Sequence, residues 1–101
     1  MYYTYMLRCA DNSIYTGMTN DLDKRISEHL SKDKNSAKYT KSHDAVKLEA
    51  AWKSKDKSLA CKLEYQIKTL SKMQKEALIN GKKLSNYLNG KIDCRRYRRI
   101  V

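Results

Sequence analysis

Hydrophobic and aromatic side chains gather in two short runs within the first twenty residues, and a polar segment separates them. The runs are YYTYMLRC at residues 2–9 and IYTGMT at residues 14–19, and both are rich in residue types that favour strands. The segment ADNS between them consists of residues that form turns readily. The pattern predicts a β-hairpin.

A helical period follows the hairpin. A leucine or isoleucine recurs every four residues, at Leu22, Ile26 and Leu30. Side chains at this spacing form one apolar stripe, which predicts a helix over about residues 20–31. Thr19 or Asn20 can cap its first turn.

The next part of the chain has no period at first and then alternates. Residues 31–44 contain many polar and basic side chains, which predicts a basic loop. In VKLEAAW at residues 46–52 every second side chain is apolar. These positions are Val46, Leu48, Ala50 and Trp52. Their alternation predicts a third strand with one covered face.

Two further helices are expected after this strand. The apolar positions return to a helical period at Leu59, Leu63, Ile67 and Leu70. They predict an amphipathic helix that begins near Asp56 or Ser58. Ser71 and Gln74 have the spacing of a capping box, which predicts a third helix that Gly81 can end.

The predicted elements follow in the order ββαβαα, which indicates an α/β (α+β) fold with helices beside a small sheet. The 101 residues fit a single domain. We expect residues 1–81 to form the module. Residues 82–101 end in RRYRR, a cluster that is hard to bury, so we expect a basic C-terminal extension, as a short helix or a tail.

Composition indicates the class of partner and the cellular compartment. The chain has 22 Lys and Arg against 11 Asp and Glu, and its net charge of +11 favours a polyanionic partner, nucleic acid above all. It has no apolar run long enough for a membrane span, and its first residues lack signal-peptide features, so we expect a cytoplasmic protein. Cys9, Cys61 and Cys94 are too far apart for a disulfide framework or a zinc site, so mostly buried, reduced thiols are expected.

One group of side chains predicts a pocket. Because side chains alternate along a strand, Tyr15 and Gly17 share a face of the second strand, and Tyr5 of the first strand can neighbour them. The missing side chain of Gly17 is expected to leave a hollow where the backbone of a ligand approaches. Arg25 and His29 lie four residues apart, so they project from one face of the first helix.

These residue types suit a phosphate ester. The guanidinium of Arg25 can bind phosphate oxygens through parallel hydrogen bonds, which stabilises charge that grows in the transition state. Glu64 lies beside the apolar stripe of the second helix, from where its carboxylate could hold Mg²⁺. A single carboxylate is sufficient when water and substrate oxygens supply the other ligands.

The order and spacing of these motifs resemble the GIY-YIG nuclease module. The motifs are YTYML, IYTG, Arg25, His29, Glu64 within KLEYQIKTL, and AKYT at residues 37–40. The resemblance extends over residues 2–80 and is strongest to the short stand-alone bacterial members. It implies a three-stranded antiparallel sheet flanked by helices. It also implies an endonuclease that depends on Mg²⁺ or Mn²⁺ and hydrolyses phosphodiester bonds.

The resemblance assigns roles residue by residue. It places Tyr5 and Tyr15 as the motif tyrosines, Gly17 as the motif glycine, and Arg25, His29 and Glu64 as the arginine, the histidine and the metal-binding glutamate. The sequence departs from the family pattern at three places. Tyr3 and Thr4 stand where the family usually has Gly and Ile, and Met18 stands where repair nucleases often have lysine. Many relatives also have an asparagine late in the domain, for which Asn80, Asn86 and Asn89 are all candidates.

The implied mechanism is hydrolysis by an activated water. A tyrosine, provisionally Tyr5, takes the proton, while Tyr15 and His29 orient the water and Arg25 stabilises the phosphate. The expected substrate is DNA, with RNA as an alternative. Recognition of branches, flaps, nicks or single strands in repair or recombination is expected. The expected strand contacts are Lys32, Lys34, Lys38, Tyr39, Lys41, Arg95, Arg96, Arg98 and Arg99.

Other functions are compatible with the same residues. In a non-catalytic nucleic-acid-binding module the tyrosines would stack on bases, and Glu64 would only pair with Lys68 on its helix. Arg25 could likewise pair with Asp21. A ribosome-associated or partner-dependent protein would use the positive charge for docking.

Overall fold

The computed structural model describes residues 1–31 and 44–101 and confirms the predicted hairpin. Strand β1, Tyr2–Cys9, pairs antiparallel with β2, Ile14–Thr19. The turn between them includes Asn12 with a φ of 70°, a left-handed conformation that asparagine tolerates better than most residues. In the register of this pair Tyr5 lies directly opposite Gly17.

The sheet has four strands, in the order β2-β1-β3-β4. Strand β3, Ala45–Ser54, pairs antiparallel with β1, as an antiparallel α+β fold requires. The fourth strand was not predicted: β4, Arg98–Arg99, belongs to the basic C-terminal segment and pairs with Trp52 and Lys53. The expected three-stranded sheet therefore gains an edge strand from the end of the chain.

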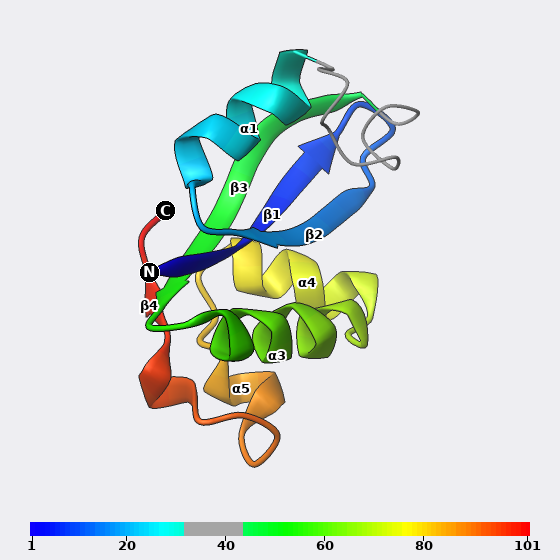
Figure 1. Ribbon diagram of the computed structural model, residues 1–101. Coiled ribbons are helices and arrows are strands. Elements are labelled where there is room, and N and C mark those ends of the chain that lie inside the picture. The colour runs from blue at the N-terminus through cyan, green and yellow to red at the C-terminus, as the bar shows by residue number, and fades with distance from the viewer. Residues whose placement is uncertain (32–43) are drawn as a thin grey trace.

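Helices cover both faces of this sheet (Figure 1). Helix α1, Leu22–Ser31, lies on one face, and α3, Lys57–Lys68, and α4, Lys72–Ile79, lie on the other. Asp56 caps α3, and Ser71 and Gln74 form the predicted capping box of α4. The short helix α5, Ser85–Leu88, follows α4. None of the helices in the described part of the chain is long and apolar enough to cross a membrane.

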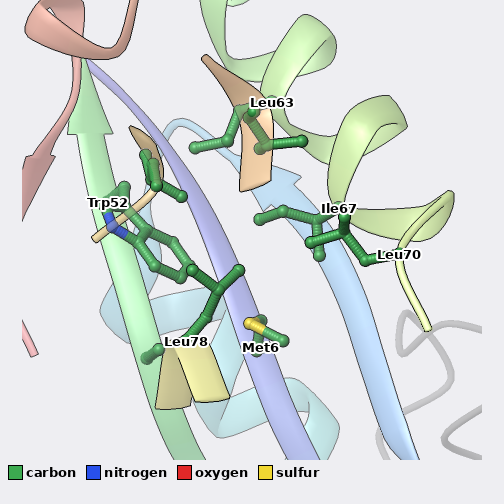
Figure 2. Close-up of a cluster of buried hydrophobic side chains, with 9 residues drawn as sticks. Met6, Trp52, Leu63, Ile67, Leu70 and Leu78 are labelled. Carbon is green, nitrogen blue, oxygen red and sulfur yellow. The ribbon is translucent and has the colours of Figure 1, made fainter. Parts of the chain in front are cut away.

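The main hydrophobic core lies between the sheet and helices α3, α4 and α5 (Figure 2). Met6 and Trp52 from the sheet pack there against Leu63, Ile67 and Leu78 from the helices, and all five are almost fully buried. Close packing of these large side chains supplies most of the apolar burial that stabilises the fold.

A smaller core on the opposite face of the sheet corrects two expectations. It contains Leu7 and Ala51 beneath α1. The second half of β3 is therefore covered on both faces, whereas the alternation in the sequence predicted one covered face. Val46, at the other end of β3, is 53% exposed. Leu30 is also exposed, and the side chain that α1 buries near its end is His29.

The C-terminal segment packs on the rest of the molecule. The hydroxyl of Tyr97 donates to the carbonyl of Leu59 at 2.6 Å. The guanidinium of Arg99 donates to the carbonyls of Leu78 and Ile79 at the end of α4 and lies 5.5 Å from the ring centre of Trp52. The carbonyl of Leu78 also accepts from the backbone N–H of Gly81 at 3.1 Å, so Arg99 adds to the hydrogen bonds that end α4.

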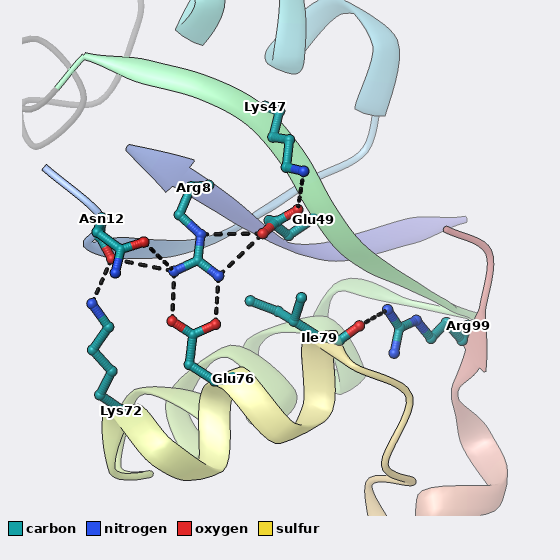
Figure 3. Close-up of polar contacts among 8 residues, drawn as sticks. All are labelled: Arg8, Asn12, Lys47, Glu49, Lys72, Glu76, Ile79 and Arg99. Carbon is teal, nitrogen blue, oxygen red and sulfur yellow. Dashed lines mark hydrogen bonds and ion pairs between the residues drawn. The ribbon is translucent and has the colours of Figure 1, made fainter. Parts of the chain in front are cut away.

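A charged network joins the sheet to α4 (Figure 3). Arg8 of β1 forms a bidentate pair with Glu76 of α4, and its Nε donates to Glu49 of β3 at 3.1 Å. The hydrogen bonds from Arg8 hold the pKa of Glu76 below its usual range. Elsewhere, Cys9 is buried and Cys94 is partly buried, as predicted, whereas Cys61 is exposed, and all three are free thiols.

Candidate active site

The hairpin and helix α1 bring three aromatic rings together on the α1 face of the sheet. Tyr5 is only 1% exposed, and its hydroxyl forms a 2.8 Å hydrogen bond with Nε2 of His29. The ring centre of Tyr15 lies 5.3 Å from that of His29 and 6.3 Å from that of Tyr5. The rings of Tyr5 and His29 meet edge to face. The predicted neighbourhood of Tyr5, Tyr15 and His29 is therefore present.

Gly17 makes this cluster possible, but in a way that differs from the expectation. A Cβ atom at this position would lie 2.6 Å from the hydroxyl oxygen of Tyr5 and 3.0 Å from Cε2 of Tyr15. The space above Gly17 is filled by the Tyr5 ring, so it is not a hollow for the backbone of a ligand. Glycine is needed here because the tyrosine opposite folds across it.

Burial controls the protonation of the inner pair. Burial, with a smaller contribution from the Arg25 charge, lowers the pKa of His29 to about 4, so the imidazole is neutral at pH 7. Burial also raises the pKa of Tyr5 above its ordinary value of 10.0, while Arg25 acts in the opposite direction. Tyr5 and His29 thus form a neutral pair in which one hydrogen is shared between the phenol oxygen and Nε2.

Arg25 is held beside this pair by an acidic neighbour. Its Nη1 donates to Oε1 of Glu28 at 3.0 Å, and only 25% of the Arg25 side chain is exposed. Glu28 was not singled out from the sequence, although its position three residues after Arg25 is a helical pairing distance. Asp21 accepts a hydrogen bond from the backbone of Lys24, as a helix-capping residue does.

Glu64 approaches the cluster from α3. Its Oε2 lies 3.2 Å from Nζ of Lys68, the helical pair that the sequence also allowed. Its charge acts on the phenols of both Tyr15 and Tyr5, raising their pKa values. No cluster of three or more His, Cys, Asp or Glu side chains that could hold a metal ion occurs within residues 1–31 and 44–101. The Glu64 side chain is 23% exposed, and its carboxylate fits a hard cation that takes its remaining ligands from water and phosphate.

The other candidate residues lie apart from this cluster or outside the described residues. Asn80, Asn86 and Asn89 lie at the end of α4 and around α5, on the opposite face of the sheet from α1. The loop candidates Lys32, Lys34, Lys38, Tyr39 and Lys41 fall outside the described residues.

The four arginines of the C-terminal segment differ in what they contact. Arg95 and Arg96 are largely exposed and pair with Asp93, and Arg98 is exposed. Arg99, in contrast, directs its guanidinium to the end of α4 and to Trp52. Of these four, Arg99 therefore has the side chain least accessible to a nucleic-acid strand.

Comparison with known proteins identifies the family of this chain. The sequence profile of the GIY-YIG catalytic domain matches residues 1–77, which include every residue of the cluster. The chain belongs to the GIY-YIG family. This match confirms the resemblance and indicates a nuclease domain.

Relatives of this GIY-YIG protein are found in bacteria and archaea. A UPF0213 protein of Fusobacterium nucleatum is 52% identical over 79 residues, which cover 78% of this chain and 77% of the relative. A UPF0213 protein of Halobacterium salinarum is 42% identical over 78 residues, covering 77% of this chain and 99% of the relative. The solution NMR structure of a UPF0213 protein from Bacillus halodurans superposes with a TM-score of 0.52 at 38% identity, covering 92% of this chain and 98% of that one. The fold prediction is thereby confirmed.

Proposed function

We propose that this GIY-YIG protein is a metal-dependent endonuclease that hydrolyses phosphodiester bonds in DNA. The observation that supports this function best is the convergence of a neutral Tyr5–His29 pair, the half-buried Tyr15 and the oriented Arg25, with the Glu64 carboxylate acting on both phenols. Hydrolysis of a phosphodiester needs groups that position a water, a cation that binds the phosphate oxygens and a ligand for a metal. These five side chains offer groups for all three roles.

Arg25 is the residue that we assign to the phosphate. A guanidinium binds phosphate oxygens through parallel hydrogen bonds, and it does so best when its orientation is set in advance. The ion pair with Glu28 restricts the Arg25 side chain in this way. Removal of a single preorganised donor to a transition-state oxyanion costs about 3 to 4 kcal/mol in enzymes of known mechanism.

Tyr15 is the phenol that we place next to the attacking water. Its side chain is partly exposed, whereas Tyr5, the provisional choice from sequence, is buried and bonded to His29. Burial raises the pKa of Tyr15, while the Lys68 charge lowers it. Lowering a phenol pKa by roughly two units corresponds to about 2.7 kcal/mol, which a phosphate-bound cation and Arg25 can supply together. Tyr5 and His29 would then orient Tyr15 and the water.

Glu64 is the residue that would hold the cofactor. Mg²⁺ or Mn²⁺ bound there would neutralise charge on the phosphate and on the leaving oxygen. The carboxylate lies at the edge of α3, and both phenols respond to its charge. Such a metal would complement Arg25, which would bind the same phosphate from the side of α1.

We propose that the substrate is recognised by its structure rather than by a long base sequence. The matched domain covers residues 1–77, and the segment after it packs on the core. Exposed lysines and arginines contact phosphates, which positions a strand without identifying its bases. Branched, flapped, nicked or single-stranded DNA in repair or recombination fits such recognition.

The test is cleavage of labelled single-stranded, duplex, nicked, branched and flapped DNA, with Mg²⁺, Mn²⁺ or EDTA. We expect cleavage with either metal and none with EDTA. Glu64→Gln should abolish cleavage and keep most of the binding, whereas Asp23→Asn, an exposed acid on α1, should change neither. DNA binding without cleavage of any substrate would contradict the nuclease and favour a binding module. A Glu64→Gln protein that still cleaves DNA would instead remove Glu64 from the metal site.

A further inference from the structure

A cavity lies between the loop that follows α4 and the C-terminal segment, and it is separate from the candidate active site. Its volume is about 450 Å³, and its lining comes from residues 81–85, from the segment at residues 94–99 and from Trp52. Cavities that bind small molecules usually have volumes of roughly 300–1,000 Å³. Trp52 packs in the main core, whereas Tyr5 and Tyr15 lie on the α1 face of the sheet. We call this cavity the basic pocket.

The charged side chains that line the basic pocket are all cationic. They are Lys82, Lys83, Arg95 and Arg99, and no carboxylate of the described residues lines the pocket with them. Arg95 pairs with Asp93 at 3.1 Å, but Asp93 also pairs with a second arginine, Arg96. Lys82 and Lys83 are exposed and have no ion-pair partner among the described residues. The pocket therefore has an excess of positive charge, which attracts an anion.

The guanidinium of Arg99 is a fixed part of the pocket wall. It donates to three backbone carbonyls, those of Leu78, Ile79 and Val101. It also lies 5.5 Å from the ring centre of Trp52. Carbonyls hold the guanidinium in place, but unlike a carboxylate they carry no net charge to neutralise it. Arg99 thus adds a positive charge to the pocket without needing to be ordered when a ligand binds.

The rest of the wall is apolar and aromatic. Trp52 is 3% exposed and Leu84 is 6% exposed, so both lie deep in the lining. Tyr97 is partly buried, and its hydroxyl donates to the carbonyl of Leu59 at 2.6 Å, which fixes its ring. Walls that are already ordered reduce the entropy that a ligand loses on binding. An apolar wall below exposed cations suits a ligand with a flat ring at one end and an anionic group at the other.

We propose that the basic pocket binds a nucleotide. Lys82 and Lys83 bind its phosphate through charge-assisted hydrogen bonds, and its base lies against the wall of Trp52, Leu84 and Tyr97. A free nucleotide and an unpaired nucleotide of a DNA strand share this chemistry. Neither Arg25 nor Glu64 lines the pocket, so this site is additional to the proposed nuclease site and does not depend on cleavage.

The first experiment is a titration with AMP, adenosine and ribose 5-phosphate, followed by tryptophan fluorescence. Trp52 is the single tryptophan of the chain and lines the pocket, so its emission reports a ligand there. We expect AMP to bind about tenfold more tightly than adenosine, which lacks the phosphate, and than ribose 5-phosphate, which lacks the base. Absence of AMP binding, or equal affinity for AMP and either fragment, would refute the nucleotide site.

Paired substitutions test the phosphate contacts. The double variant Lys82→Met/Lys83→Met should weaken AMP binding at least about tenfold, because it removes charged donors to the phosphate. Its matched control is Lys55→Met/Lys57→Met, which removes the same charge from exposed lysines that do not line the pocket, and it should bind AMP as the wild type does. Both should keep the wild-type melting temperature. Equal AMP affinity of the two double variants would refute the assignment. Loss of AMP binding in Arg25→Met alone would place the nucleotide in the active site and also refute it.

Alkylation of the cysteines locates the ligand independently. Cys94 lines the basic pocket, whereas Cys61 is exposed on α3 and does not line it. AMP should therefore slow the reaction of Cys94 with iodoacetamide and leave the reaction of Cys61 unchanged, as mass spectrometry can measure. A Cys94 rate that AMP does not change would contradict binding in this pocket.

Competition identifies the source of the nucleotide. Displacement of AMP by a single-stranded oligonucleotide, but not by a blunt duplex, supports an unpaired nucleotide of a strand as the ligand. AMP binding that the oligonucleotide does not displace supports a free nucleotide. The nuclease is tested separately: AMP binding without DNA cleavage supports the basic pocket and contradicts the nuclease, and cleavage without AMP binding does the reverse.

Discussion

Gly17→Ala is the substitution whose effect follows most directly from the geometry. The added methyl would lie 2.6 Å from the hydroxyl oxygen of Tyr5 and 2.8 Å from its Cζ, well inside van der Waals contact. Tyr5 is 1% exposed and bonded to His29, so moving its ring disturbs a buried contact. Overpacking of this kind typically costs about 1–3 kcal/mol. Displacement of the ring also breaks the hydrogen bond to His29, worth about 1 kcal/mol.

We therefore expect Gly17→Ala to lower the free energy of unfolding by about 2–4 kcal/mol. Urea denaturation measures this decrease, and a drop in melting temperature of roughly 4–8 °C should accompany each kcal/mol. Cleavage should fall on the same sample, because the Tyr5–His29 pair is displaced. In a strand without this contact, a residue of higher β-propensity in place of glycine would be tolerated or even favourable.

A double-mutant cycle identifies the cause. In a Tyr5→Leu background the shorter side chain leaves room for the methyl, so Gly17→Ala should cost at least 1 kcal/mol less than in the wild type. Equal costs in the two backgrounds would show that Tyr5 is not the reason for glycine at this position. A wild-type melting temperature for Gly17→Ala would refute the packing argument directly.

Three further predictions concern the same structure. The pKa of His29 is lowered to about 4 in the folded protein, so protonation of His29 as the pH falls favours the unfolded chain. The free energy of unfolding should therefore be highest above about pH 6.5 and fall by up to about 3 kcal/mol between pH 6.5 and pH 4. Denaturation curves of His29→Gln should lack this dependence on pH. Truncation after residue 89 should lower the melting temperature by more than about 10 °C, because it removes the hydrogen bonds that Tyr97 and Arg99 donate to the helices. An unchanged melting temperature would show instead that the module expected at residues 1–81 is stable without this segment. Tyr15→Phe should abolish cleavage with little loss of stability, whereas Tyr5→Phe should lower both cleavage and melting temperature, because it removes the hydrogen bond to His29. If instead Tyr5→Phe abolishes cleavage and Tyr15→Phe retains it, Tyr5 is the phenol next to the water.

Local sequence was sufficient to predict strands β1, β2 and β3 and helices α1, α3 and α4, but not strand β4. The Asp56 cap and the Ser71–Gln74 capping box lie where the sequence placed them, since a capping interaction spans only a few residues. Alternation along the strands likewise predicted that Tyr5 and Tyr15 are neighbours, because the hairpin register follows from its short turn.

Tertiary structure decided which of these side chains are buried and what they contact. Periodicity identifies an apolar stripe but not the element that covers it, so the sequence predicted burial of Leu30, whereas the hairpin tyrosines cover His29 instead. Gly17 is required by the ring of Tyr5, a contact across two strands that no local pattern contains. In the sequence Arg99 belongs to a cluster that is hard to bury. In the folded chain the last carbonyls of α4 and the face of Trp52 come together and bind its guanidinium.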